Sequence, residues 1–238
     1  MQTHQKFNLN GLSQPDRLFS EYQKLVYSIR SHLTKYGLKK RAFSKNNISR
    51  FSELPFQSRY EIVLRLRAYQ ALCQDGEDCG FGALEDPKAL LRFVAFRLRV
   101  NTPEDFLAAL APGDIVEIFD FDGEQVYRNI NFFEISDYTL DEIFGSSWDL
   151  LYERSKSVTK KIFERVEVAA KTRGCIPFDI PEHYMRERCT EERKIVKVRL
   201  KYLASLTRDG EAVAWIASSE AVDLPASEKA VENKLRFI

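Results

Sequence analysis

The sequence of 238 residues lacks a long uninterrupted apolar run. Its apolar stretches, such as 89–96, are broken by charges such as Arg92, whereas a membrane-spanning helix needs about 20 predominantly apolar residues. The N-terminus includes His4, Lys6 and Asn8 and lacks the apolar segment of about 7 to 15 residues that a signal peptide carries. We therefore expect a cytoplasmic protein with no membrane span.

Cysteine is scarce, and its spacing fits no dense framework. Cys73, Cys79, Cys175 and Cys189 form no CxxC pair, which favours free thiols in a reducing compartment. A disulfide between Cys73 and Cys79 is the alternative. Cys175, His183 and Cys189 lie near one another in the sequence, but their spacing matches no zinc motif, so we expect no metal site.

The sequence does contain enough apolar side chains for a core. Hydrophobic residues make up 44% of the chain and aromatic residues 12%, while 30% are charged, which is typical of a globular protein rather than a disordered one. At about 150 residues a domain the length allows one or two domains, and we expect two.

Charge is unevenly distributed along the chain. The formal net charge is +1, yet residues 1–74 hold 13 Lys and Arg against 4 Asp and Glu, a net of +9 that leaves −8 for the rest. The densest basic run consists of Lys35, Lys39, Lys40, Arg41, Lys45 and Arg50. Such a run either binds phosphate groups through counterion release or forms a solvated surface. We favour the solvated surface, because no zinc finger, RNP sequence or basic zipper accompanies the charge.

Helical periodicity dominates residues 1–112. Leu18, Tyr22, Leu25 and Ile29 recur every three or four residues within 17–36, which predicts a helix with a broad apolar face. Further helices are expected over 57–74, where Tyr60, Val63 and Leu64 share one side, and over 87–100 and 103–110. The glycine-rich and acidic residues 75–86 are expected to form a loop. We interpret this helical region as a site of dimerisation or partner docking.

The pattern becomes extended after the sequence Ala111-Pro112-Gly113. Strands are predicted over 114–121 and 125–129, joined by Asp122-Gly123, and over 195–207 and 212–218, joined by Asp209-Gly210, because such dipeptides favour hairpin turns. Between these hairpins, short helices are expected over 131–135, 140–144 and 147–153, and a longer helix over 155–172. In the long strand the even positions from Val196 to Ala204 are apolar and are expected to face inward.

These elements and several of their residues resemble the PAS domain family over about residues 113–224. The resemblance is carried by Tyr127-Arg128-Asn129, then Phe132-Phe133, then the run Asp137-Tyr138-Thr139-Leu140-Asp141-Glu142-Ile143-Phe144-Gly145. Asp137 stands where the family usually has glycine. The resemblance implies an α+β fold in which a helical region precedes a five-stranded antiparallel sheet with helices on one face. Residues 1–112 resemble no family, and 225–238 form a tail or a short helix.

The resemblance also implies an interior that either binds a small apolar ligand or is filled by side chains. The candidates for lining it are Phe119, Phe133, Ile143, Trp148, Leu151 and Tyr202. We expect no cofactor. A heme-binding member needs a histidine near the longer helix, and flavin-binding or coumarate-binding members need a suitably placed cysteine; residues 155–172 contain no histidine and residues 129–153 no cysteine.

The expected function is sensing and protein–protein interaction rather than catalysis, because no acid–base pair or activated nucleophile is apparent. Trp215 and the first helix supply the interface candidates, which are Leu18, Tyr22, Leu25, Ile29 and Trp215. We expect a homodimer that binds a protein partner in a signalling pathway and has no output domain of its own. For Trp215, packing by residues 89–111 of the same chain is the alternative. For the whole protein, the alternative is a ligand-responsive regulator that binds nucleic acid through its basic N-terminal helices.

Overall fold

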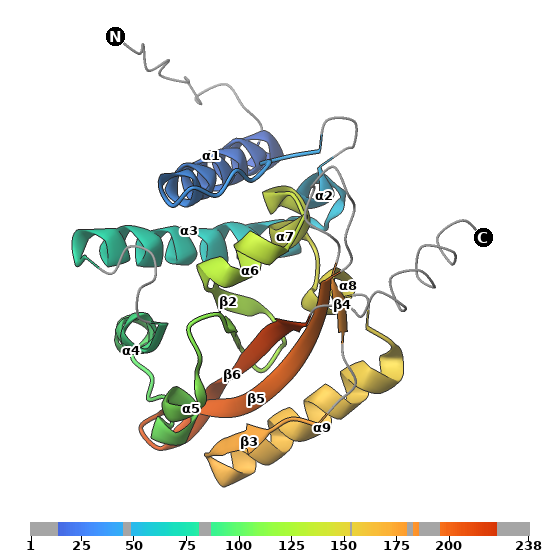
Figure 1. Ribbon diagram of the computed structural model, residues 1–238. Helices are drawn as coiled ribbons and strands as arrows, with labels where there is room; N and C mark the ends of the chain where they lie inside the picture. Colours follow the sequence, from blue (N-terminus) through green and yellow to red (C-terminus); the bar gives the residue numbers. More distant parts are fainter. Residues whose placement is uncertain are drawn as a thin grey trace.

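The computed structural model describes residues 14–44, 49–80, 87–152, 154–179, 183–185 and 196–222 (Figure 1). The helices are α1 (Gln14–Lys35), α2 (Arg50–Glu53), α3 (Phe56–Asp78), α4 (Pro87–Leu98), α5 (Glu104–Ala109), α6 (Ile130–Ile135), α7 (Leu140–Gly145), α8 (Trp148–Leu151) and α9 (Lys156–Thr172). The strands are β1 (Ile115–Phe119), β2 (Gln125–Arg128), β3 (Cys175–Pro177), β4 (His183–Met185), β5 (Val196–Arg208) and β6 (Glu211–Val222).

All six strands form one antiparallel sheet in the order β2-β1-β6-β5-β3, and β4 pairs with the same strand, β5, as β3 does. The expected α+β fold is therefore confirmed, with two short strands in the fifth position of the sheet. The β5–β6 turn has the predicted Asp209-Gly210 sequence, and both residues have positive φ, at 51° and 81°. Positive φ at both central residues gives the turn a twist that matches its strands.

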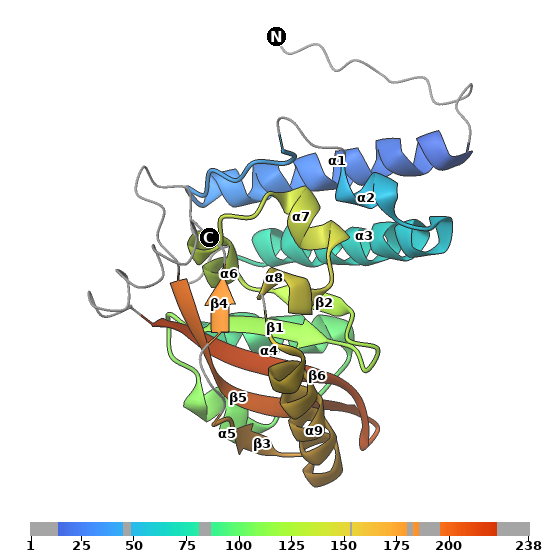
Figure 2. The same cartoon turned by 90° about the vertical axis from the view of Figure 1, so that its right-hand side faces the viewer.

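Helices cover both faces of the sheet. In Figure 2, α9 lies in front of the strands, and α4 and α5 lie behind them. On the α9 side, Ile162 and Val166 pack against Leu203 and Trp215. On the other side, Phe106 of α5 belongs to the same buried cluster as the neighbouring strand residues. Residues of the segment 89–111 thus help to cover the second face, but Trp215 lies on the α9 face, so the alternative that this segment packs on Trp215 is wrong.

The helices α1 and α3 pack side by side beyond the β2 edge of the sheet and run in the same direction (Figure 1). Three pairs of polar side chains fix the position of α1 along α3. They are Glu21 with Arg67, Ser28 with Gln70, and Lys35 with Glu77. One continuous buried cluster includes Val26 of α1, Leu66 of α3 and Ile118 of β1. Packing is therefore not divided at the boundary expected between residues 112 and 113.

Several local expectations are wrong. Residues 75–78 continue α3 instead of forming a loop, and Gly76 is buried beside Phe93 of α4. Tyr60 and Leu64 are exposed, because the buried side of α3 is turned toward Ile62, Leu66 and related positions.

The inward alternation of β5 is also interrupted. The register shifts between Leu200 and Tyr202, so that Lys201 is an additional residue in the strand. Its ammonium group lies 2.8 Å from Asp114 Oδ1. Lys197, which precedes this shift and was expected to point outward, is also buried. A register shift of one residue exchanges the faces to which the following side chains point.

Cys73, Cys79 and Cys175 are free thiols, so the alternative disulfide is not formed. Cys189 and residues 225–238 lie outside the described residues. In the part of the chain that the structure describes, no helix is long and apolar enough to cross a membrane.

Candidate functional site

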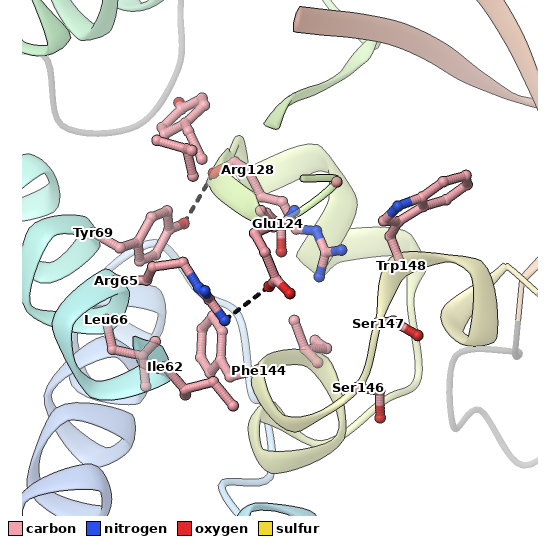
Figure 3. A pocket seen from close by; sticks show the side chains of 15 residues that line it. Ile62, Arg65, Leu66, Tyr69, Glu124, Arg128, Phe144, Ser146, Ser147 and Trp148 are labelled. Carbon is pink, nitrogen blue, oxygen red and sulfur yellow. Dashed lines mark hydrogen bonds and ion pairs between the residues drawn. The ribbon is translucent and has the colours of Figure 1, made fainter. Parts of the chain in front are cut away.

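A small pocket lies between α3 of the N-terminal region, strand β2 and the α7–α8 segment (Figure 3). Its cavity volume is about 60 Å³. The apolar part of the lining includes Ile62, Leu66, Phe144 and Trp148. The β1–β2 turn closes one side, because Gly123, with a φ of 80°, approaches Trp148 so closely that a Cβ there would lie 3.2 Å from the indole nitrogen. The pocket is thus built jointly by the N-terminal helices and the sheet domain.

Arg128 is the buried polar group of this pocket. Its side chain is 2% exposed, and its Nε donates a 2.7 Å hydrogen bond to Glu117 Oε1. Glu117 also accepts hydrogen bonds from the Tyr152 hydroxyl and, at 3.2 Å, from Gln125 Nε2. The guanidinium carbon lies 4.1 Å from the centroid of the Phe132 ring. Burial, and then the charge of Glu117, raise the pKa of Tyr152 well above its usual value, so its hydroxyl stays protonated as a donor.

One nitrogen of this guanidinium remains without a partner. Arg128 Nη1 is buried and has no hydrogen-bond acceptor in the structure. Figure 3 shows the guanidinium directed into the pocket, toward the side where Trp148 lies. A buried donor without a partner destabilises the folded protein by about 1–3 kcal/mol. An acceptor that enters the pocket and binds this donor would reduce that penalty.

The mouth of the pocket carries a second arginine. Arg65 of α3 forms a 2.8 Å ion pair with Glu124 of the β1–β2 turn, and this pair joins the two halves of the chain (Figure 3). Outside it lies a larger groove of about 570 Å³ between α2 and α3 on one side and α7 and α8 on the other. Ile62, Arg65 and Phe144 line both, so the groove leads to the small pocket.

The α7 helix that borders the pocket comes from the Asp137–Gly145 run. Thr139 caps α7: its side chain accepts from the Glu142 N–H, and the Glu142 carboxylate accepts in return from the Thr139 N–H. This reciprocal arrangement is a capping box. Ring contacts place Tyr69 of α3 beside Phe144, with centroids 6.2 Å apart. The residues that carry the resemblance therefore shape the wall of the pocket.

Asp141, in the first turn of α7, binds the N-terminal region. Its Oδ1 accepts hydrogen bonds from the Tyr22 hydroxyl at 2.9 Å and from Ser49 Oγ at 2.6 Å. Its Oδ2 accepts from the Arg50 N–H at 2.8 Å. The Tyr22 ring stacks on Phe51, with centroids 3.9 Å apart. Three donors from α1 and the start of α2 thus converge on one buried carboxylate of the sheet domain.

Gly145, the last residue of the same run, allows α2 to approach. A Cβ at this position would lie 2.9 Å from the Arg50 Cβ and 3.2 Å from the Phe51 nitrogen. The segment before α2 is attached separately, because the N–H groups of Leu140 and Asp141 donate to the carbonyls of Arg41 and Ala42.

The structure brings together only some of the residues predicted to line a ligand pocket. Ile143 and Trp148 line the small pocket, and Leu151 lines the groove. Phe119 instead stacks on Trp215 at 4.3 Å, and Phe133 is buried against Phe132. Tyr202 is half-buried at the side of the larger core cluster. The sequence pattern missed Arg65, Glu124 and Arg128, although Tyr127-Arg128-Asn129 had marked this strand.

The five predicted interface residues are buried within the chain itself. Leu18, Tyr22, Leu25 and Ile29 belong to the cluster that joins α1 to α3, and none is more than 9% exposed. Trp215 faces α9, and its Nε1 donates to the Asp120 carbonyl at 2.9 Å. These side chains offer no surface to a second copy.

Most of the predicted basic patch contacts acidic or polar groups of the same chain. Lys35 pairs with Glu77, Lys40 donates to Ser136, Arg41 lies 3.9 Å from Asp137, and Arg50 lies 3.6 Å from Glu53. Lys39 is exposed and, together with Lys40 and Arg41, lines a cleft beside α6. Lys45 lies outside the described residues. Of these residues, Lys40 and Arg41 attach the segment after α1 to the residues just before α7.

Among the described residues, no group of three or more His, Cys, Asp or Glu side chains could hold a metal ion. Of the three residues that were considered for such a site, Cys175 is half-buried, and Cys189 lies outside the described part.

No family model and no curated protein matches the sequence. Two solved structures illustrate its similarity in fold. The PAS domain of a protein from Colwellia psychrerythraea is 14% identical, with 46% of this chain and 86% of that one covered and a TM-score of 0.34. An RNA-binding light-oxygen-voltage receptor is 11% identical, with 93% of this chain and 65% of that one covered and a TM-score of 0.31. The described residues between 113 and 222 form the antiparallel sheet with helices that the resemblance to PAS domains implies, and no family is recognised for the N-terminal region.

Proposed function

We propose that this protein is a non-enzymatic signalling module in which the PAS-like part senses a small molecule and the N-terminal helices transmit the result. The observation that carries the proposal is the set of hydrogen bonds to Asp141. This carboxylate is part of α7, which borders the pocket, and its donors belong to Tyr22, Ser49 and Arg50. A ligand that displaces α7 therefore acts directly on α1 and α2.

Hydrogen exchange in the full chain tests this coupling. Thr139→Ala removes the cap of α7, and it should increase amide exchange in α1 as well as in α7. Ser155→Ala is the matched control, because Ser155 caps α9, which lies against the sheet on the side away from α4 and α5. Unchanged exchange in α1 of the Thr139→Ala variant would overturn the proposed route.

Dimerisation is the second part of the proposal, and α3 offers the surface for it. Phe56, Tyr60 and Leu64 recur every four residues and are 41%, 45% and 41% exposed. A two-fold antiparallel pairing of two α3 helices centred on Tyr60 places Phe56 of one copy opposite Leu64 of the other. Such a self-complementary apolar stripe suits a symmetric contact, and the occupant we propose is a second copy of the chain.

Light scattering after size-exclusion chromatography tests the dimer. We expect a dimer for the wild type and a monomer for Leu64→Glu, with Tyr184→Glu as a control at another exposed aromatic residue. A wild-type chain that stays monomeric would overturn this part.

Native mass spectrometry of the purified protein tests sensing. A ligand that copurifies with the wild type and is lost from a Val126→Phe variant would support the small pocket as its site.

A further inference from the structure

We infer that the pocket between α3 and β2 binds a short monocarboxylate, whose carboxylate accepts a hydrogen bond from Arg128 Nη1. The inference rests on the proposed function, because it names the ligand class of that sensor. It differs from an apolar ligand held between the sheet and α9, since that space is packed with Phe119, Trp215 and the apolar face of α9.

The unpartnered donor gives the first reason. Arg128 is held in place by Glu117 through its Nε, while Nη1 has no acceptor and belongs to a side chain that lines the pocket. Arginine N–H groups bind carboxylate oxygens with short, charge-assisted hydrogen bonds. Glu117 binds Nε and also accepts hydrogen bonds from Tyr152 and Gln125. Nη1 is therefore left available to a ligand.

The charged groups of the lining give the second reason. The charged lining residues are Arg65, Glu124 and Arg128. Arg65 and Glu124 pair with each other at the mouth, and Glu117, which is not a lining residue, compensates the charge of Arg128. Arg128 Nη1 still has no acceptor, so the pocket favours a ligand that carries acceptor oxygens over a cationic one.

The cavity volume and the apolar lining limit the size of the ligand. A volume of about 60 Å³ holds about four to six water-sized groups, at roughly 10–15 Å³ for each. Ile62, Leu66 and Phe144 form an apolar wall for a short hydrocarbon tail. Propionate and butyrate fit these requirements, whereas an eight-atom acid such as hexanoate exceeds them.

Titration calorimetry on the full chain is the test, with sodium propionate, sodium butyrate, sodium hexanoate and propionamide as probes at constant ionic strength. We expect propionate and butyrate to bind at least about tenfold more tightly than propionamide, which has the same shape without the charge. Equal affinity for propionate and propionamide, or no binding of any acid, would overturn the inference.

Three variants locate the site. The pair Glu117→Gln with Arg128→Met removes both buried charges together and should weaken propionate binding at least about tenfold. Val126→Phe fills the pocket from β2 without touching the ion pair, so it keeps the test decisive if the double variant does not fold. Arg199→Gln removes an arginine that pairs with Glu220 elsewhere, and it should bind normally. Unchanged binding by Val126→Phe would show that the carboxylate binds elsewhere and would overturn the assignment.

The two proposals fail separately. Propionate binding without any change of hydrogen exchange in α1 would preserve the ligand assignment and overturn the signalling route. A Thr139→Ala effect on α1 without carboxylate binding would do the reverse.

Discussion

Tyr22 and Asp141 are 119 positions apart in the sequence, and the Tyr22 hydroxyl donates a 2.9 Å hydrogen bond to the Asp141 carboxylate. Burial, and then the charge of Asp141, raise the pKa of Tyr22 well above its usual value, so the hydroxyl remains a donor at neutral pH. This bond connects the first helix of the N-terminal region to the helix that borders the pocket.

Tyr22→Phe should lower the free energy of unfolding by about 1.5–3 kcal/mol, because a hydrogen bond to a charged group is lost while the stacking on Phe51 remains. Urea denaturation followed by circular dichroism measures the loss. Tyr27→Phe is the control, since Tyr27 is half exposed, and a loss of the same size in both variants would contradict the explanation.

Gly145→Ala should destabilise the protein by about 1–3 kcal/mol, because the added Cβ meets the backbone of Phe51 as well as Arg50. Gly113→Ala should change stability by less than about 0.5 kcal/mol, since nothing lies within 4 Å of the added atom. Thermal unfolding of the two variants in parallel gives the comparison. Equal stabilities would show that α2 moves freely away from α7.

Glu117→Gln alone should cost about 3–5 kcal/mol, because it leaves the Arg128 charge buried without its partner. The double variant with Arg128→Met should cost much less, because both charges are removed together. A double-mutant cycle in urea measures the difference. Additive losses would mean that the two side chains do not interact as the structure shows.

Burial raises the pKa of the Cys73 thiol from 9.0 to about 12. The folded state therefore retains this proton while the unfolded state loses it, so the contribution of Cys73 to stability falls as the pH rises from 9 toward 12. Cys73→Ser or Cys73→Ala should make the free energy of unfolding depend less on pH in that window.

At pH 8 we also expect iodoacetamide to modify the exposed Cys79 well before Cys73. Peptide mass mapping gives the order, and faster labelling of Cys73 would contradict it.

The periodic elements were predictable from the sequence because their signals are local. The apolar stripe that includes Leu18 and Ile29 predicted α1, and Asp209-Gly210 predicted the β5–β6 turn. The strands β3 and β4 have three residues each, too few for an alternating pattern to be recognised. The extension of α3 through Gly76 was missed because packing against Phe93 outweighs the low helix propensity of glycine.

The candidate site was only partly predictable, because it depends on contacts between distant segments. Trp148 and Ile143 were expected at a pocket, but their partners Leu66 and Arg65 come from a helix that resembles no family. Arg128 Nη1 lacks an acceptor because Glu117 binds Nε, and pattern and spacing do not specify the position of Glu117. The exposed side of α3 was likewise misassigned, because apolar spacing alone does not tell which of two apolar sides of a helix faces its neighbours.

The continuous buried cluster that joins α1, α3 and α5 to the sheet limits how this protein can be recombined. A chimera that transplants residues 113–222 alone onto another protein would leave behind Phe106 and the side chains around it, and the outer face of the sheet would then meet water. Such a fragment would aggregate unless another segment covered this apolar face. A domain exchange therefore has to transfer both halves of the chain together.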